Sequence, residues 1–204
     1  MKMKIFLLGA FVQLMLCHSA TAQMVEPDAV NGADDATYVR SALPLDEPRH
    51  LCIDLPGHGS SIQLDAAFTV HTCKDGMWNL DQRIEWSSDK AELKMPQYDK
   101  CLAAKAVNAG EEIFLADCDS ANTQWVSKQS RLQLTADTSL CITIADGVSE
   151  LTPGGKKFPQ RYRARALTLD KCSDAAMERQ LWSVTLPLAL DEALLPPSGS
   201  LPVE

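Results

Sequence analysis

The stretch CSDAAMERQLW at residues 172–182 ends the last of three similar units in this chain of 204 residues. CKDGMWNLDQRI at residues 73–84 and CDSANTQW at residues 118–125 are the corresponding stretches of the first two units. Each runs from a cysteine through a polar turn to a glutamine or threonine, with a large apolar residue two places later. An earlier cysteine followed by an aliphatic residue opens each unit, at Cys52, Cys101 and Cys141. A period of about 40–55 residues indicates one supersecondary unit used three times.

Alternation of polar and apolar residues predicts that these units consist of strands. RLQLT at residues 131–135 and ALTLD at residues 166–170 both alternate, which is the period of a half-buried strand. The strands are separated by turn-forming segments, namely Pro56-Gly57, Asn108-Ala109-Gly110 and Pro153-Gly154-Gly155. No long stretch has a helical period. The sequence therefore predicts an all-β domain of about twelve short strands with pseudo-threefold symmetry.

The first residues have the features of an export signal. Lys2 and Lys4 precede a mainly apolar stretch at residues 5–16, and small residues follow at Ala20-Thr21-Ala22. This pattern predicts a signal peptide of residues 1–22, so that the mature protein is secreted or periplasmic. An uncleaved anchor is an alternative, but the apolar stretch is short for it. A lipoprotein signal at Cys17 is another, but leucine precedes this cysteine where a small residue is expected.

Cleavage of the signal would leave six of the seven cysteines: Cys52, Cys73, Cys101, Cys118, Cys141 and Cys172. An even number in an exported chain indicates disulfides, and pairing within each unit is the simplest of about 15 possible connectivities. Each bond would stabilise the fold by roughly 3 kcal/mol on chain-entropy grounds. Zinc is the competing use of cysteine, but no pair has C-x2-C spacing and no histidine stands at ligand spacing. We therefore expect no metal.

Composition and missing motifs exclude several classes of function. The formal charge of −8 argues against a nucleic-acid partner, which needs a basic face. No apolar run of the mature chain is long enough to span a membrane. DLPGHGS at residues 54–60 resembles a hydrolase loop, but no G-x-S-x-G follows it, so His58 is expected to be a turn residue. Because no phosphate-binding, dinucleotide-binding or metalloprotease motif occurs, we expect neither a cofactor nor a catalytic residue.

Two flanking segments lie outside the repeats. Residues 23–37 are acidic and rich in small residues, which predicts a flexible arm. Tyr38 to Ser41 is expected to form the first strand of a domain that runs over residues 38–188. Residues 189–204 are proline-rich and are predicted to form an extended C-terminal tail.

The three tails resemble the ricin B-type lectin family, the disulfide-bearing β-trefoils with a Q-x-W repeat. Gln180-Leu181-Trp182 is an intact Q-x-W, Thr123-Gln124-Trp125 has threonine in place of the first glutamine, and Gln82-Arg83-Ile84 has isoleucine in place of tryptophan. The resemblance covers about residues 38–188. It implies a β-trefoil in which these tail residues are mainly structural.

The resemblance also implies where a sugar would bind. The family uses an aspartate two residues after the first cysteine, an aromatic residue two before the second, and an asparagine just before the Q-x-W glutamine, which Asp81 replaces here. In the first repeat these positions, with the glutamine, are occupied by Asp54, His71, Asp81 and Gln82. A carboxylate can hold two sugar hydroxyls while a flat ring covers the apolar face. An alternative for Asp54 is that it caps the turn at Pro56-Gly57.

The other two repeats lack the same set. The second has Ala103 and Ala116 at the two leading positions, and the third has Thr143 and Asp170. The resemblance therefore implies at most one site of the familiar type.

A basic loop lies within the longer third repeat, in residues 153–165. Its candidate contacts for an anionic partner are Lys156, Lys157, Arg161 and Arg163. Arginine forks fit carboxylate and sulfate groups, so an acidic glycan or a protein would be a suitable partner. The alternative is an ordinary solvated loop. Trp78 in the first repeat is a second candidate contact, with a core position as its alternative.

Two functional hypotheses follow. The first is a secreted, non-catalytic carbohydrate-binding module with its site in the first repeat. The second is a β-trefoil that has lost sugar binding and serves as a protein-interaction subunit of a secreted assembly.

Overall fold

The computed structural model describes residues 37–57, 59–74, 80–157, 159 and 161–185. The predicted signal peptide, most of the acidic arm and the C-terminal tail lie outside these residues, as do His58 and Trp78. The strands are β1 (Tyr38–Ser41), β2 (Leu51–Asp54), β3 (Thr69–Thr72), β4 (Glu85–Ser87), β5 (Glu92–Met95), β6 (Lys100–Ala104), β7 (Ile113–Ala116), β8 (Trp125–Lys128), β9 (Arg131–Leu134), β10 (Asp137–Ile144), β11 (Glu150–Leu151), β12 (Arg163–Lys171) and β13 (Trp182–Thr185). The helical segments are η1 (Gly59–Ser61), η2 (Pro96–Tyr98), α1 (Pro153–Lys157) and η3 (Met177–Arg179).

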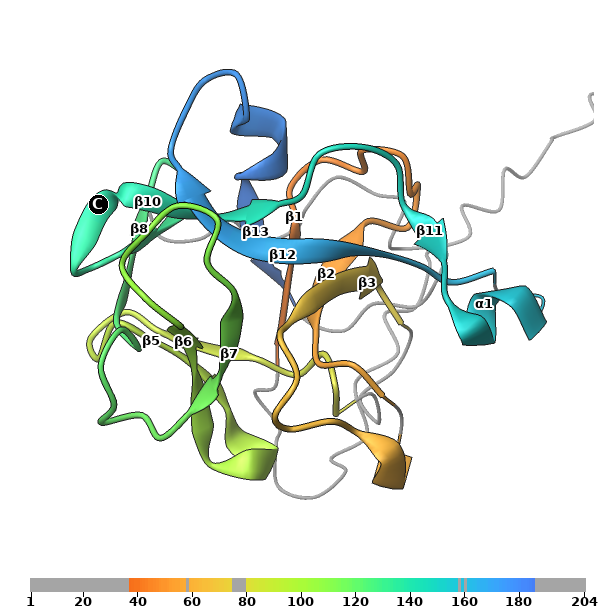
Figure 1. Cartoon of the computed structure of the whole chain (residues 1–204), viewed down its shortest axis with the longest axis horizontal. Helices are drawn as coiled ribbons and strands as arrows, with labels where there is room; N and C mark the ends of the chain where they lie inside the picture. The colour runs from red at the N-terminus through yellow and green to blue at the C-terminus, as the bar shows by residue number, and fades with distance from the viewer. Residues whose placement is uncertain (1–36, 58, 75–79, 158, 160, 186–204) are drawn as a thin grey trace, which may run out of the picture.

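These strands form a β-trefoil, as predicted from the sequence (Figure 1). The first repeat contributes β1 to β4, the second β5 to β8, and the third β9 to β13. One sheet has the order β13-β1-β2-β3-β12-β10-β9-β8, with β11 paired to β12, and the other has the order β4-β5-β6-β7. The described part has thirteen strands, one more than expected, because the longer connection of the third repeat contains the two-residue strand β11.

Each repeat is centred on one antiparallel hairpin: β2 with β3, β6 with β7, and β10 with β12. The register is the same in all three, because the first cysteine pairs with the residue two places before the second: Cys52 with His71, Cys101 with Ala116, and Cys141 with Asp170. The hairpins are closed by the disulfides Cys52–Cys73, Cys101–Cys118 and Cys141–Cys172. The predicted pairing within each repeat is therefore confirmed.

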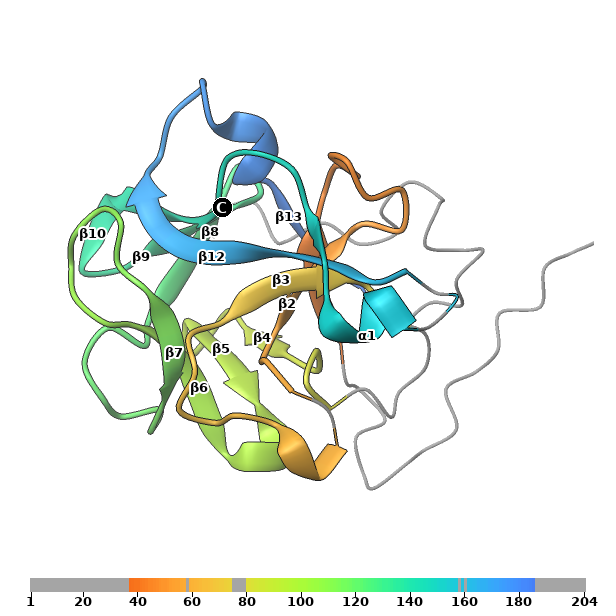
Figure 2. The ribbon, with the colours of Figure 1, turned by 45° about the vertical axis from the view of Figure 1, so that its right-hand side comes forward.

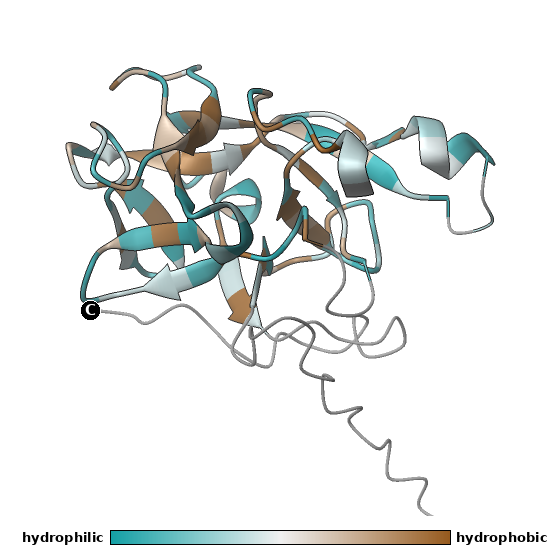
Figure 3. Ribbon diagram, turned by 90° about the horizontal axis from the view of Figure 1, so that it is seen from below, coloured by the Kyte–Doolittle hydropathy of each residue, from teal (hydrophilic) through white to brown (hydrophobic). Residues whose placement is uncertain are grey.

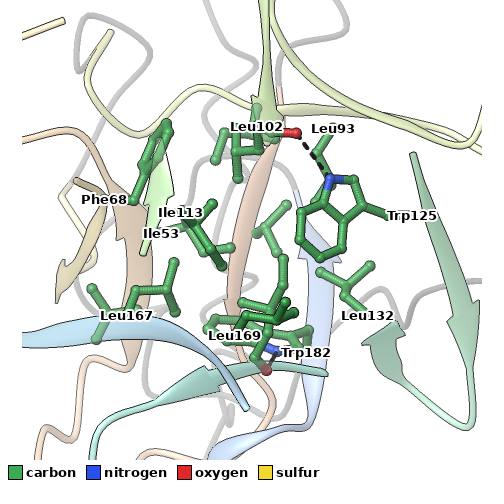
Figure 4. Packing of buried hydrophobic residues seen from close by; sticks show 14 of the residues in the cluster. Ile53, Phe68, Leu93, Leu102, Ile113, Trp125, Leu132, Leu167, Leu169 and Trp182 are labelled. Carbon is green, nitrogen blue, oxygen red and sulfur yellow. Dashed lines mark hydrogen bonds between the residues drawn. The ribbon is translucent and has the colours of Figure 1, made fainter. Parts of the chain in front are cut away.

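Two tail residues, Trp125 of the second repeat and Trp182 of the third, pack within the buried core (Figure 4). Trp125 and Trp182 are fully buried, and their indole N–H groups donate to the carbonyl oxygens of Leu102 and Ile142 at 2.9 and 3.0 Å. Ile84 takes the same place in the first repeat and is also buried. A tryptophan with its single donor satisfied contributes a large apolar surface at no polar cost, so two such residues anchor a core that contains few aromatics.

The only α-helix in the described residues is the five-residue α1, which lies beside β11 near the start of β12 (Figure 2). In Figure 3 this end of the molecule is white to teal, as expected for a segment of glycine and lysine residues. No described helix has the length and apolarity needed to cross a membrane.

Candidate functional site

The four residues predicted for a sugar site come together beside the first hairpin. The register of β2 with β3 places His71 opposite Cys52 and Asp54 opposite Thr69. The turn that ends the repeat is fastened to the same hairpin, because the backbone N–H of Leu55 donates to the carbonyl of Asp81 at 2.9 Å. Asp54 thus approaches Asp81 and Gln82 although 27 residues separate Asp54 from Asp81 in the sequence.

Gln82 joins the parts of this site. Its side-chain amide donates to Oδ2 of Asp54 at 2.9 Å and to the carbonyl of Thr72 at 3.2 Å. Its oxygen accepts the backbone N–H of Lys74 at 2.9 Å. Because Gln82 is fully buried and all three contacts are made, it holds the Asp54 carboxylate in one orientation.

Lys74 is a site residue that the sequence analysis missed. Its ammonium lies 3.1 Å from Oδ2 of Asp54 and also bonds Oδ2 of Asp81. The side chains are 11% exposed for Lys74, 4% for Asp54 and 3% for Asp81, so Lys74 is the most accessible of the three side chains. The only feature of the sequence that could have pointed to Lys74 is its position directly after Cys73. That position does not show which acids the lysine bonds.

Burial dominates the ionisation of this cluster. It raises the pKa of Asp54 to about 7, with the charge of Lys74 acting against this and the charge of Asp81 adding to it. Burial alone would lower the pKa of Lys74, but the two carboxylates together raise it. Near neutral pH Lys74 is therefore charged, while Asp54 is present in both its protonated and its ionised form.

His71 occupies the position of the family's stacking ring. It is half-buried, its Nδ1 lies 2.9 Å from the carbonyl oxygen of Thr72, and its ring centroid lies 5.3 Å from that of Tyr162. Burial and the positive charge of Lys74 lower the pKa of His71 to about 4, so the imidazole is neutral at neutral pH. A neutral planar ring is the form that suits contact with an apolar sugar face.

Within the part of the chain that the structure describes, no hydrogen bond supports the alternative role of Asp54 as a cap of the Pro56-Gly57 turn. Among the described residues, the Asp54 carboxylate bonds Gln82 and Lys74, not the Pro56-Gly57 turn. That turn is closed by its own backbone, because the N–H of Gln63 donates to the carbonyl of Pro56 at 2.8 Å.

The third repeat has the same framework with different chemistry. Gln180 donates to the hydroxyl of Thr143 at 2.9 Å and to the carbonyl of Lys171 at 2.8 Å, and it accepts the N–H of Ser173 at 3.0 Å. Arg179, which corresponds to Asp81, donates to the carbonyl of Ile144 at 2.6 Å. A hydroxyl therefore replaces the carboxylate, and a cation replaces the second acid.

The second repeat lacks the glutamine. Thr123 stands in its place and its hydroxyl donates to the carbonyls of Cys118 and Ser120, both at 2.9 Å. With Ala103 at the position of Asp54, this repeat has no carboxylate at the corresponding place.

The four cations of the basic loop are not equivalent. Lys156, Lys157 and Arg161 are exposed. Arg163 is half-buried, and its Nη1 donates to the carbonyl of Ser149 at 2.7 Å. Three of the four side chains are thus exposed to solvent, while that of Arg163 is held by its hydrogen bond to the backbone of Ser149.

The described residues contain one cluster with metal-ligand atoms, formed by Glu92, Cys101 and Cys118. The two cysteines are joined in a disulfide, so they supply no thiolate for a metal. Two open depressions of the described residues, of about 430 and 670 Å³, share Asp146 and Arg165 of the third repeat, and the larger is also lined by Leu45 and Asp46 of the first. The sequence analysis did not predict them.

The fold is a β-trefoil, and solved structures that include lectins share it. The solution structure of the mdaA-1 domain has a TM-score of 0.55 at 11% identity, over 76% of this chain and 91% of that one. The C-half of an earthworm R-type lectin in complex with GalNAc has a TM-score of 0.51 at 11% identity, over 74% of this chain and 97% of that one. The agglutinin from Abrus precatorius has a TM-score of 0.53 at 18% identity, over 74% of this chain and 48% of that one.

No protein-family model matches the chain, and no curated protein sequence matches it. The similarity to known proteins is therefore one of fold.

Proposed function

We propose that this protein is a secreted, non-catalytic carbohydrate-binding module with its site at Asp54, His71, Asp81 and Gln82. The observation that carries the proposal is the hydrogen bond from Gln82 to the Asp54 carboxylate, next to the neutral ring of His71. Only the first repeat combines a carboxylate and a planar ring at these two positions. Ligands named for proteins of the same fold, GalNAc and α-methyl-D-galactoside, make galactose-type sugars the first choice.

Lys74 would take part in binding. Its ammonium bonds both carboxylates, so a sugar hydroxyl can replace it at Asp54 while the bond to Asp81 stays. The ammonium N–H that no longer bonds Asp54 can then donate to a ring oxygen or a hydroxyl oxygen of the sugar. Because the site must give up one internal ion pair to bind, we expect weak affinity at each single site.

The test is a glycan array on oxidised protein of residues 23–204, with Asp54→Asn as the site variant. Asp170→Asn is the matched control, since it makes the same chemical change at an exposed residue of the third repeat. The proposal expects galactoside binding that Asp54→Asn abolishes and Asp170→Asn retains. Absence of galactoside binding by the folded wild type, or binding that survives Asp54→Asn, would refute it.

A second candidate function is protein interaction, and the internal pairing of the site favours it. Lys74 already bonds both acids, while Lys156, Lys157 and Arg161 are exposed on one loop. Under this hypothesis the triple variant Lys156→Glu, Lys157→Glu, Arg161→Glu would lose an acidic partner at low ionic strength. Asp54→Asn would have no effect on that partner.

An extracellular or periplasmic location is part of the proposal. Three disulfides are typical of an oxidising compartment. The signal peptide predicted at residues 1–22 agrees with this location, and mass spectrometry of the exported N-terminus would test it.

A further inference from the structure

We propose that Tyr162, a residue of the third repeat, forms a second subsite beside the first-repeat site, and that the ligand is a glycan of at least two sugar units. The inference rests on the proposed function and adds the size of the ligand to it. Four observations support it: the pairing of β3 with β12, the packing of α1, the contact with Arg49, and the angle between two rings.

Strand pairing brings Tyr162 to the site. In the pairing of β12 with β3, Ala164 lies opposite His71. Tyr162 stands two residues before Ala164, so it lies at the same edge of the β2–β3 hairpin. Arg163 strengthens this junction, because its backbone N–H donates to the hydroxyl of Thr72 at 2.8 Å. The His71 ring contacts that of Tyr162, with the centroids 5.3 Å apart, and the charges of Lys74 and Asp81 also act on it.

The long loop of the third repeat is packed around the backbone of Tyr162. The N–H of Thr152 donates to the Tyr162 carbonyl at 3.0 Å, and the Thr152 hydroxyl accepts the N–H of Gly155 at 2.9 Å. A Cβ at Gly155 would lie 2.0 Å from that carbonyl oxygen, so only glycine allows α1 to approach so closely. Thr152 is thus hydrogen-bonded to the backbone of Tyr162, and α1 packs closely against the same carbonyl.

The ring of Tyr162 also contacts a fixed cation of the first repeat. The guanidinium carbon of Arg49 lies 5.6 Å from the ring centroid, within the range of a cation–π contact. Arg49 cannot swing freely, because its Nε and Nη2 donate to the two oxygens of Glu47 at 2.8 and 3.0 Å. Glu47 in turn accepts the hydroxyl of Thr72 at 3.0 Å. Tyr162 is therefore oriented by residues of the first repeat.

The angle between the two rings indicates two sugar units. The planes of His71 and Tyr162 are inclined by 51°, so one flat pyranose face cannot lie parallel to both. Both side chains are only half-buried, which leaves surface of each available for contact. A glycosidic bond allows successive sugar units to turn relative to one another. A disaccharide can therefore place one unit at Asp54 and His71 and the next against Tyr162.

Isothermal titration with methyl β-D-galactoside and lactose tests this inference. We expect the wild type to bind lactose more tightly than the monosaccharide. Tyr162→Ala should weaken lactose binding about three- to tenfold, the size of one aromatic contact, and leave the monosaccharide affinity unchanged. Tyr162→Phe should behave as the wild type, and so should Pro159→Ala, a control at an exposed residue of the same loop.

Each outcome has a distinct meaning. If Asp54→Asn abolishes binding of both sugars while Tyr162→Ala binds lactose as the wild type does, the second subsite is refuted and the proposed function stands. If Tyr162→Ala binds either sugar more tightly, the side chain blocks the site and the inference is again refuted. If the wild type binds neither sugar, the proposed function fails and the second subsite fails with it. Tyr162→Leu replaces the alanine variant if the latter does not fold, because it keeps an apolar side chain and removes the ring.

Discussion

Gln82 donates to the carboxylate of Asp54 at 2.9 Å, whereas the equivalent residue of the third repeat, Gln180, donates to a threonine hydroxyl at the same distance. The glutamine therefore has the same place in both repeats, but it donates to a carboxylate in the first and to a hydroxyl in the third. A hydroxyl satisfies the glutamine without any charge. The carboxylate brings a buried charge that must be balanced, and Lys74 supplies the balance.

Asp54 should make the protein less stable as pH rises. Its folded pKa of about 7 exceeds the ordinary value of 3.8, so the folded state binds more protons between these limits. The stabilising contribution is complete below pH 4 and is lost as pH rises through 7. Asp54→Asn should remove this loss, gaining about 2–4 kcal/mol relative to the wild type between pH 4 and 8. Urea unfolding at both pH values measures it, and a constant difference between the two proteins would contradict the assignment.

His71 should act in the opposite direction. Its folded pKa of about 4 lies below the ordinary value of 6.5, so the unfolded state binds more protons in this range. The contribution is complete above pH 6.5 and is lost as pH falls through 4. His71→Phe should remove up to about 3 kcal/mol of the acid-induced loss. Titration of the His71 ring by NMR provides the direct check, and an ordinary pKa would disprove the prediction.

Lys74→Met should be strongly destabilising, because it leaves two buried carboxylates without a cation. Loss of one partner of a buried ion pair costs about 3–5 kcal/mol, and the cost should grow as pH rises and Asp54 ionises. Lys105→Met is the matched control: Lys105 pairs with Glu112 at 3.1 Å on the surface, with side chains 63% and 56% exposed. That variant should change the free energy of unfolding by less than about 1 kcal/mol. Similar losses for the two variants in thermal unfolding would contradict the importance of the buried cluster.

The disulfides should contribute according to the length of chain that each closes. Replacing Cys141 and Cys172 by serine opens a separation of 31 residues, and replacing Cys101 and Cys118 opens one of 17. Each loss should cost about 3 kcal/mol, with the first larger by about 0.5 kcal/mol on chain-entropy grounds. Guanidinium unfolding of the two double variants gives the comparison, and the reverse order would show that native-state packing dominates.

The sequence by itself determined the β-trefoil, the three disulfides and the location of the candidate site. The disulfides and the candidate site depend on contacts within one repeat, where Cys52 and Cys73, for example, are only 21 residues apart. The trefoil was predicted because one unit occurs three times, although its closure also needs pairing between repeats, such as that of β1 with β13. The cysteine separations differ, at 21, 17 and 31 residues, but each pair lies in one hairpin, with the first cysteine opposite the residue two places before the second. The position of Gln82 beside Asp54 follows from the same local rule.

Only the tertiary structure showed that Lys74 bonds both acids and that Tyr162 lies against His71. The first depends on side-chain conformations in a buried turn, where any of several cations could have balanced the charge. The second depends on the pairing of β3 with β12, which joins the first repeat to the third across about ninety residues of chain, and such pairing leaves no local pattern in the sequence. Contacts between repeats are selected by the packing of the whole fold, and for that reason the composition of the site became visible only in three dimensions.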